Sequence, residues 1–209
     1  MTNRTVALVG VPIVLGIAAL YAGSARLSGH AFGFGKSNGC TLVQQPAEGD
    51  VTPIHVECRW PVAAERLNGL LTDVEAQSRI FSGLTESVLI EKRDDYALVR
   101  QVQQARGMAD REVILEWRIE PIPHGYRYQF QKARDQSALT GKRVEVAQNA
   151  GYWQVVSDRD GTQLVYELRY LPGGDLSPFL VHMFQASAVN EAMSELRGAA
   201  ESQILTRRE

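Results

Sequence analysis

Residues 161–181 decide the fold, and their sequence is GTQLVYELRYLPGGDLSPFLV. Between Leu164 and Tyr170, large apolar or aromatic residues occupy every second position, which is typical of a β-strand with one buried face. The run Pro172–Asp175 ends this strand, because proline and consecutive glycines favour a turn. Ser177–Pro178 then supplies a helix cap and a first helical residue. The stretch therefore predicts a strand, a glycine turn and the start of a helix.

A single long helix is predicted after this turn. From Phe179 to Ala200, apolar residues recur at every third or fourth position, so they form a stripe along one side of the helix. A stripe of this length predicts a helix that packs along a large surface. We expect the domain to end with this helix near residue 203, and residues 204–209 to form a tail.

The chain before this stretch predicts a strand, a pair of short helices and then a run of strands. The alternating residues 54–60 form the first strand, and Pro61 opens a helix that is followed by a second one over 73–81. Tight turns separate the later strands, which indicates an antiparallel sheet. We expect these strands around residues 88–90, 98–103, 113–119, 126–131 and 144–156.

This order of elements predicts an α+β fold, in which a curved antiparallel sheet wraps around the long C-terminal helix. A long antiparallel sheet twists and curls, so its concave face needs a cover. The last helix is the only predicted element long enough to provide one. A cavity between such a sheet and helix is suited to small apolar ligands.

Six segments follow one another in an order that resembles a known family. They are Leu71–Asp73, Phe81–Leu84, Ala109–Val113, Gly151–Val155, Gly161–Leu168 and Pro172–Val181. In this order, residues 51–203 resemble a START domain, the lipid-transfer branch of the helix-grip superfamily that also contains pollen allergens and aromatic polyketide cyclases. The last segment resembles the family's glycine turn and the proline at the start of its lid helix.

The resemblance implies that the chain binds a lipid, a sterol or a polyketide-like ring between sheet and helix, without a cofactor. Apolar burial stabilises by roughly 25 cal/mol per Å², so an apolar tunnel can hold a lipid without any reactive group. Arg118 or Glu116 would orient a polar head group if they face inward. The alternative is that each aromatic is an ordinary core residue. The expected lining residues are Trp117, Arg118, Tyr128, Phe130, Trp153, Tyr166, Met183 and Phe184.

Two other functions stay open, a polyketide cyclase-like enzyme and a structural or interaction domain with a filled interior. An enzyme of this kind needs a titratable residue inside the cavity. The 4 histidines have no partners at metal-ligand spacing, and no nucleophile motif occurs. We therefore expect no metal site and assign no catalytic residue.

Residues 1–25 differ in character from the rest of the chain. No charged side chain occurs from Thr5 to Ala25, and Arg4 and Arg26 flank the apolar run. A basic start, an apolar core and small residues are typical of an export signal, and a run of about 20 residues is also long enough for a membrane anchor. We expect an exported domain, periplasmic or extracellular, that is secreted after cleavage or held by an N-terminal apolar helix. A buried core helix is the remaining alternative.

The two cysteines agree with export, because Cys40 and Cys58 have neither metal-site nor Cys-x-x-Cys spacing. We favour a disulfide between them in an oxidising compartment, with two free thiols as the alternative. Closing this loop would stabilise the fold by roughly 3 kcal/mol. Residues 26–50 are rich in glycine and poor in pattern, so we expect a linker or an irregular cover.

Composition and charge narrow the possible partners. With 44% hydrophobic and 22% charged residues, the chain has enough apolar side chains to fold. Its formal net charge of -2 argues against non-specific nucleic-acid binding, which needs a basic excess. The predicted partners are therefore a hydrophobic small molecule or lipid and, through the N-terminal segment, a membrane.

Overall fold

The structure, a computed structural model, describes residues 32–104 and 108–206. The predicted export signal or anchor at residues 1–25 lies outside the described residues. Within the described part, no helix combines the length and the apolar character that crossing a membrane requires.

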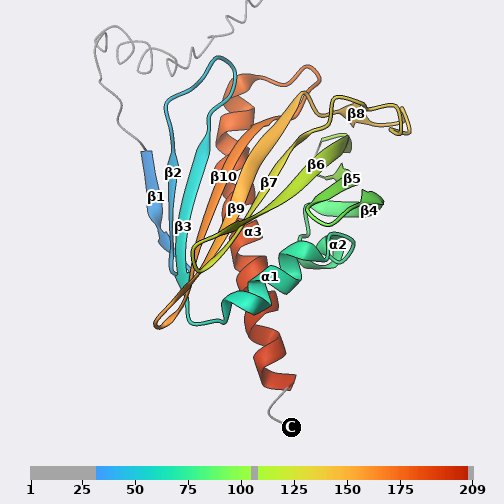
Figure 1. Cartoon of the computed structure of the whole chain (residues 1–209). Coiled ribbons are helices and arrows are strands. Elements are labelled where there is room, and N and C mark those ends of the chain that lie inside the picture. The colour runs from blue at the N-terminus through green and yellow to red at the C-terminus, as the bar shows by residue number, and fades with distance from the viewer. Residues whose placement is uncertain (1–31, 105–107, 207–209) are drawn as a thin grey trace, which may run out of the picture. The chain divides into compact units, whose positions relative to one another are not determined.

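The described residues form ten strands and three helices, in nearly the predicted order (Figure 1). The predicted strand at residues 54–60 and the predicted start of the last helix at Pro178 are confirmed. That helix continues to Thr206, so residues 204–206 of the expected tail are helical. The strands are β1 (Phe32–Ser37), β2 (Cys40–Gln44), β3 (Ile54–Trp60), β4 (Leu84–Lys92), β5 (Tyr96–Gln103), β6 (Arg111–Ile122), β7 (Gly125–Lys132), β8 (Val144–Glu145), β9 (Gln148–Asp158) and β10 (Gly161–Leu171). The helices are α1 (Ala64–Thr72), α2 (Gln77–Ile80) and α3 (Pro178–Thr206).

The strands form one sheet in the order β1-β2-β3-β10-β9-β7-β6-β5-β4, with antiparallel pairing throughout this path. The short β8 pairs with β6 in parallel. One hydrogen bond shows that the sheet curves strongly. The hydroxyl of Tyr170 on β10 donates to Gln103 Oε1 on β5 at 2.8 Å. Strands four places apart would be roughly 19 Å apart in a flat sheet. The predicted α+β fold with a curved antiparallel sheet is confirmed.

The segment predicted as a linker or irregular cover, residues 26–50, contributes two strands. β1 and β2 form a hairpin whose turn residues Asn38 and Gly39 have positive φ, and β2 pairs with β3. The linker prediction was wrong for this part, because a glycine-rich strand lacks the apolar alternation by which strands are recognised. Cys40 and Cys58 lie opposite each other on β2 and β3 and form the predicted disulfide.

The helices cover the concave face of the sheet. α1 packs against β7 and β9 and α2 against β4, while α3 packs along β2 and against both α1 and α2. In Figure 1, α3 runs the length of the sheet and extends beyond it at its C-terminal end. Gly173, with φ +73°, lies in the turn that leads into α3. Only glycine fits at this position, because a Cβ there would lie 2.3 Å from the carbonyl oxygen of Glu145. The predicted glycine turn is confirmed.

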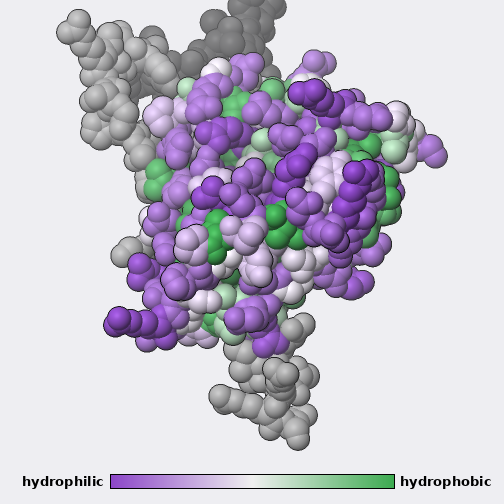
Figure 2. All heavy atoms as spheres, in the orientation of Figure 1, coloured by the Kyte–Doolittle hydropathy of each residue, from purple (hydrophilic) through white to green (hydrophobic). Residues whose placement is uncertain are grey.

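Alternation along β6 separates the two faces of the sheet. Val113, Leu115 and Trp117 are buried beneath the helices, whereas Arg118 and Glu120 are exposed on the opposite side. We call the face of Trp117 the inner face and the other the outer face. The side of the molecule seen in Figure 2 is mainly hydrophilic, with small and separate hydrophobic areas. The apolar core is therefore concentrated between the inner face and the helices.

Candidate functional site

Aromatic side chains from four strands line up across the inner face. The rings of Trp153 on β9 and Tyr166 on β10 stack with centroids 3.9 Å apart. Phe130 on β7 lies 6.2 Å from Tyr166 and 5.4 Å from Trp117 on β6, and Phe81 at the end of α2 lies 6.4 Å from Trp153. We call these five residues the aromatic row. Its rings form a continuous apolar surface beneath the helices.

A glycine allows the aromatic row to pack closely on the sheet. A Cβ at Gly151 of β9 would lie 1.9 Å from the carbonyl oxygen of Glu167 and 2.9 Å from the ring of Phe130. Gly151 pairs directly with Phe130 across β9 and β7, so the ring covers the glycine. The sequence therefore needs glycine here to hold Phe130 against β9.

Most of the predicted lining residues share the inner face, namely Trp117, Tyr128, Phe130, Trp153 and Tyr166. The prediction for Arg118 was wrong, since strand alternation places it on the outer face, exposed, with its guanidinium 5.4 Å from the centre of the Tyr96 ring. Glu116 shares that outer parity and accepts a hydrogen bond from Gln131. Phe184 on α3 was also misplaced, because it is 50% exposed. The side chain of Met183 lies outside the described part.

A hollow of about 340 Å³ lies between the α1–α2 segment and strands β4 to β7. Its lining includes Leu71 and Val74 from the helical side, and Trp117, Ile119 and Tyr128 from the inner face. Polar side chains also line it, namely Thr72, Asp73, Glu75, Lys92 and Arg93. Trp117 Nε1 is buried and has no hydrogen-bond partner among the described residues. A buried N–H of this kind is normally satisfied, so this donor is free for an acceptor that the chain does not provide.

The inner-face tyrosines are neutral at physiological pH. Burial raises the pKa of Tyr128 and of Tyr166 well above the usual tyrosine value. The hydroxyl of Tyr128 donates to Asn68 Oδ1 of α1 at 2.8 Å, which fixes the helix against β7. These tyrosines offer hydroxyl groups and ring faces to a ligand, but no negative charge.

The centre of the inner face is less tightly covered than its flanks. Tyr166 pairs with the buried Val56 and Trp153, yet its own side chain is only partly buried, as is that of Tyr170 further along β10. The backbone of α3 approaches β2, α1 and α2 rather than the middle strands. The buried α3 residues Val189, Met193 and Leu196 belong to the same apolar core as the inner face.

The inner face also carries a polar group that the sequence analysis missed. Gln103, Arg111, Asn149 and Tyr170 lie at the end of the inner face where β5 and β10 curl towards each other. Burial raises the pKa of Tyr170 to about 12, although the charge of Arg111 opposes this rise. Arg111 stands at the same alternation as Trp117, six positions earlier on β6, and this parity could have identified it.

Solved structures share this arrangement, although no family model and no curated protein matches the sequence. A STAR-related lipid transfer protein from Xanthomonas axonopodis is 18% identical with a TM-score of 0.75, covering 82% of this chain and 98% of its own. Human STARD10 is 16% identical with a TM-score of 0.75, covering 85% of this chain and 76% of its own. The chain has the START helix-grip fold. The Zhui aromatase/cyclase from Streptomyces sp. R1128 is also similar, with 17% identity, a TM-score of 0.55 and coverage of 74% of this chain and 96% of its own.

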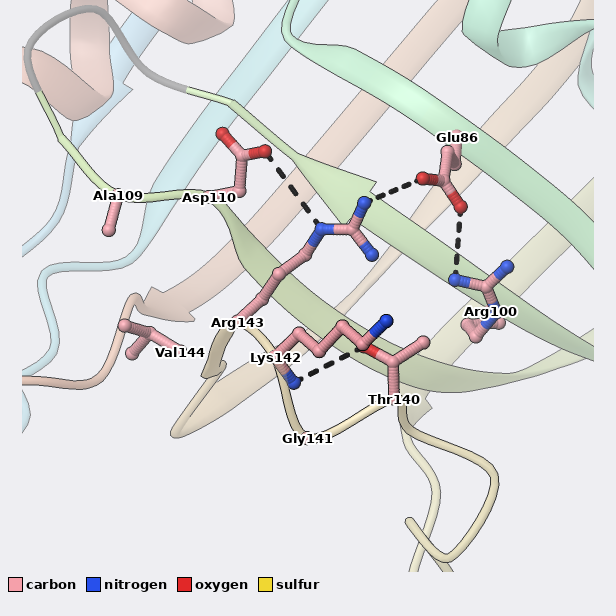
Figure 3. Close-up of a pocket in the computed structure, with 9 residues that line it drawn as sticks. All are labelled: Glu86, Arg100, Ala109, Asp110, Thr140, Gly141, Lys142, Arg143 and Val144. Carbon is pink, nitrogen blue, oxygen red and sulfur yellow. Dashed lines mark hydrogen bonds and ion pairs between the residues drawn. The ribbon is translucent and has the colours of Figure 1, made fainter.

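A second hollow of this START fold, about 660 Å³, opens near the start of β6, where the segment before β8 covers the outer face (Figure 3). Charged side chains of both signs line it and pair with one another. Arg100 lies 3.1 Å from Glu86 and 2.9 Å from Glu112, and Arg143 lies 2.7 Å from Glu86 and 3.9 Å from Asp110. We call these five residues the outer network.

Glu112 is the buried centre of the outer network. Burial by itself would raise its pKa, but hydrogen bonds from Thr140 and Arg100 outweigh burial and hold the pKa below the usual glutamate value. Both the backbone N–H and the hydroxyl of Thr140 donate to Glu112 Oε2, at 3.0 and 2.8 Å. Because these charges satisfy one another, the network fastens the segment before β8 to the START sheet.

No metal centre or catalytic set is evident within the described ranges. They contain no group of three or more His, Cys, Asp or Glu side chains that could hold a metal ion. His55 lies 3.2 Å from Glu57, and His182 lies 3.4 Å from the hydroxyl of Thr52. Neither pair includes a residue of the aromatic row.

Proposed function

We propose that this protein binds a lipid or another hydrophobic small molecule between the inner face of its sheet and its helices. The observation that carries this proposal is the 340 Å³ hollow whose floor is formed by Trp117, Ile119 and Tyr128. The aromatic row continues from Trp117 away from the hollow, through Phe130 to Tyr166 and Trp153. Concave sites of about 300 Å³ or more with mostly apolar walls and a few polar groups are typical of ligand binding.

The physical driving force is the removal of apolar surface from water. Burying such surface contributes roughly 25 cal/mol per Å², so a ligand that covers the aromatic row gains affinity without any charged contact. The free Trp117 N–H adds one directional contact, which suits a ligand with a single acceptor near the hollow.

A blocking variant tests this proposal. Ala97 lines the hollow and pairs directly with Trp117, so Ala97→Phe should fill the space beside the indole. We expect the wild-type full chain to bind a neutral fluorescent probe such as Nile red. Ala97→Phe should weaken this binding at least tenfold. Leu98→Phe, one position along the same strand on the outer face, is the matched control and should bind as the wild type does. Equal binding by both variants would contradict this location, and no binding by the wild type would contradict the function.

A filled interior is the second candidate, because the rings of the aromatic row already contact one another. In that case the domain would serve as a structural or interaction module. The same titration separates the two readings, since a filled interior takes up no probe. The cyclase-like enzyme has less support, because the two carboxylates that line the hollow, Asp73 and Glu75, are exposed rather than buried beside the aromatic row.

We also propose that the protein works outside the cytoplasm, with residues 1–25 as its export signal or membrane anchor. The Cys40–Cys58 disulfide supports this, because such bonds persist in oxidising compartments. The uncharged run Thr5–Ala25 supports it independently. Alkylation of thiols in intact cells followed by mass spectrometry of the N-terminal peptides tests both points. Unmodified cysteines with a cleaved or membrane-retained N-terminus are expected, whereas fully alkylated cysteines in the cytosolic fraction would contradict export.

A further inference from the structure

Four polar side chains meet on the inner face at the start of β6. Arg111 pairs with Gln103 across β6 and β5, and Asn149 pairs with Tyr170 across β9 and β10. The hydroxyl of Tyr170 donates to Gln103 Oε1 at 2.8 Å, which joins the two pairs across the curved sheet. We call these four residues the arginine cluster. It shares the inner face with the aromatic row.

The cation of this cluster has no counter-charge. Arg111 is 5% exposed, its Nη1 donates to the carbonyl oxygen of Ala109, and its Nε has no partner among the described residues. None of the ion pairs in the described part involves Arg111. The adjacent Glu112 has outer-face parity and pairs with Arg100 at 2.9 Å. A buried guanidinium without a carboxylate is unusual, because buried charges are normally paired.

Other polar groups beneath the helices also lack partners. Asn149 is 5% exposed, and its Oδ1 accepts no hydrogen bond from the described residues. Gln185 of α3 is 7% exposed, and neither atom of its amide has a described partner. Gln44 of β2 donates to the carbonyl oxygen of His182, but its own Oε1 is also without a described partner. So many unsatisfied buried groups on one face indicate that something other than the protein satisfies them.

We propose that the arginine cluster binds the carboxylate or phosphate head of a long amphiphile whose apolar tail lies along the aromatic row. The inference rests on the proposed function and adds the charge and the orientation of the ligand. The forked guanidinium of Arg111 donates to two oxygens of such a head at once. A hydroxyl of the head group, or a water bound with it, donates to Asn149 Oδ1.

The spacing of the two parts sets the length of the ligand. Arg111 and Trp117 are six positions apart on β6, which is about 20 Å at a rise of about 3.3 Å per residue. An amphiphile that fills both parts therefore carries a long, flexible chain rather than a compact ring. The aromatic row begins at Trp117 and runs across the strands from there, so it would contact the tail at the end away from Arg111.

A matched set of probes tests the charge of the ligand on the full chain. Dodecanoate, dodecyl phosphate and 1-dodecanol have the same tail and differ only in the head, and acetate and inorganic phosphate supply the head without the tail. We expect the two anionic amphiphiles to bind at least tenfold more tightly than 1-dodecanol in calorimetric titrations at neutral pH. Acetate and inorganic phosphate alone should show no measurable binding.

Variants of two arginines on one strand localise the effect. Arg111→Gln should reduce the preference for acid over alcohol to about one, and Arg111→Lys should keep part of it, because the charge remains while the fork is lost. Arg118→Gln, on the outer face of the same strand, should leave the preference unchanged. Thermal unfolding checks that each variant folds. The ratio measured in the wild type needs no variant and stays decisive if Arg111→Gln does not fold.

The possible outcomes separate this inference from the proposed function. If no amphiphile binds, the proposed function itself is wrong. If 1-dodecanol binds as tightly as dodecanoate, or if the preference survives Arg111→Gln, the protein binds hydrophobic ligands but the arginine cluster is not the head-group site. If inorganic phosphate binds as tightly as dodecyl phosphate, the site takes a free anion and the assignment of an amphiphile is overturned.

Discussion

Arg100 and Arg111 stand on opposite faces of the same sheet and have opposite surroundings. The side chain of Arg100 is 18% exposed and contacts the carboxylates of Glu86 and Glu112 in the outer network. Arg111 is more deeply buried, yet no carboxylate of the described residues pairs with it. One cation is neutralised by the protein, and the other is left for something else to neutralise.

This difference teaches how one sheet can serve both structure and binding. Paired charges are costly to break, because removing one partner leaves the other buried and uncompensated. An unpaired buried charge costs stability in the empty protein and is tolerated where a ligand compensates it. The outer network should therefore control stability, and the arginine cluster should control affinity.

The largest effect is expected from the centre of the outer network. Glu112→Ala removes the carboxylate that Arg100 contacts and the acceptor of both Thr140 hydrogen bonds. We expect the free energy of unfolding to fall by about 3 kcal/mol, as for other buried ion pairs that lose one partner. Urea denaturation at neutral pH measures this change.

Glu120→Ala is the matched control, because Glu120 lies on the outer face of the same strand and is exposed. Substitutions at such positions usually change stability by less than about 0.5 kcal/mol. If Glu112→Ala and Glu120→Ala behave alike, the outer network does not hold the fold together and the comparison fails.

A smaller effect is expected from acid. Because the folded-state pKa of Glu112 lies below its usual value, its contribution to stability is fully present above the ordinary glutamate pKa and is lost as the pH falls through the lowered one. Glu112→Gln removes this titration and should cost about 2 kcal/mol at pH 7, within the range for hydrogen bonds to charged groups. As the pH is lowered from about 5 to about 3, a range that spans the usual glutamate pKa, the difference in unfolding free energy between wild type and variant should become smaller. A constant difference over this range would show that Glu112 keeps its proton affinity unchanged on folding.

Strand β6 also shows which features of the site the sequence predicts and which it does not. Alternation from Val113 to Ile119 predicts β6 and places Val113, Leu115 and Trp117 on one face. The structure confirms both. The same alternation places Arg118 on the opposite face from Trp117, so the strand pattern itself argued against Arg118, which was nevertheless predicted as a lining residue. Arg111 has the same alternation as Trp117 and so lies on the inner face. It precedes the predicted strand at residues 113–119, and the alternation of apolar residues is hardest to recognise at the end of a strand.

Other features depend on contacts that a local pattern does not encode. The hairpin of β1 and β2 has glycines at alternate positions, and its pairing with β3 is fixed by a partner distant in sequence. The bond between Tyr170 and Gln103 depends on the curvature of the whole sheet, which alternation alone does not measure. The position of the outer network follows from the segment before β8 folding back over β6, a long-range contact between residues that read as an ordinary charged loop.

The arginine cluster should contribute little to stability in the absence of ligand. Arg111→Met removes an uncompensated buried charge and one hydrogen bond to Ala109, and these effects oppose each other. We expect the unfolding free energy of the ligand-free protein to change by less than about 1 kcal/mol. A loss as large as that of Glu112→Ala would make Arg111 a structural residue, and the two faces would no longer differ in role.

Another small effect is expected from the hydroxyl that joins the two halves of the arginine cluster. Tyr170→Phe removes the hydrogen bond to Gln103 and should cost about 1 kcal/mol at neutral pH. Because burial raises the folded-state pKa of Tyr170 to about 12, its stabilising contribution is complete below the unfolded value near 10 and is lost as the pH rises towards 12. The wild type should therefore lose its advantage over Tyr170→Phe in this alkaline range, as followed by urea denaturation at successive pH values. A difference that persists up to pH 12 would mean that this hydroxyl ionises as freely in the folded protein as in the unfolded chain, and that the closed end of the inner face is open to water.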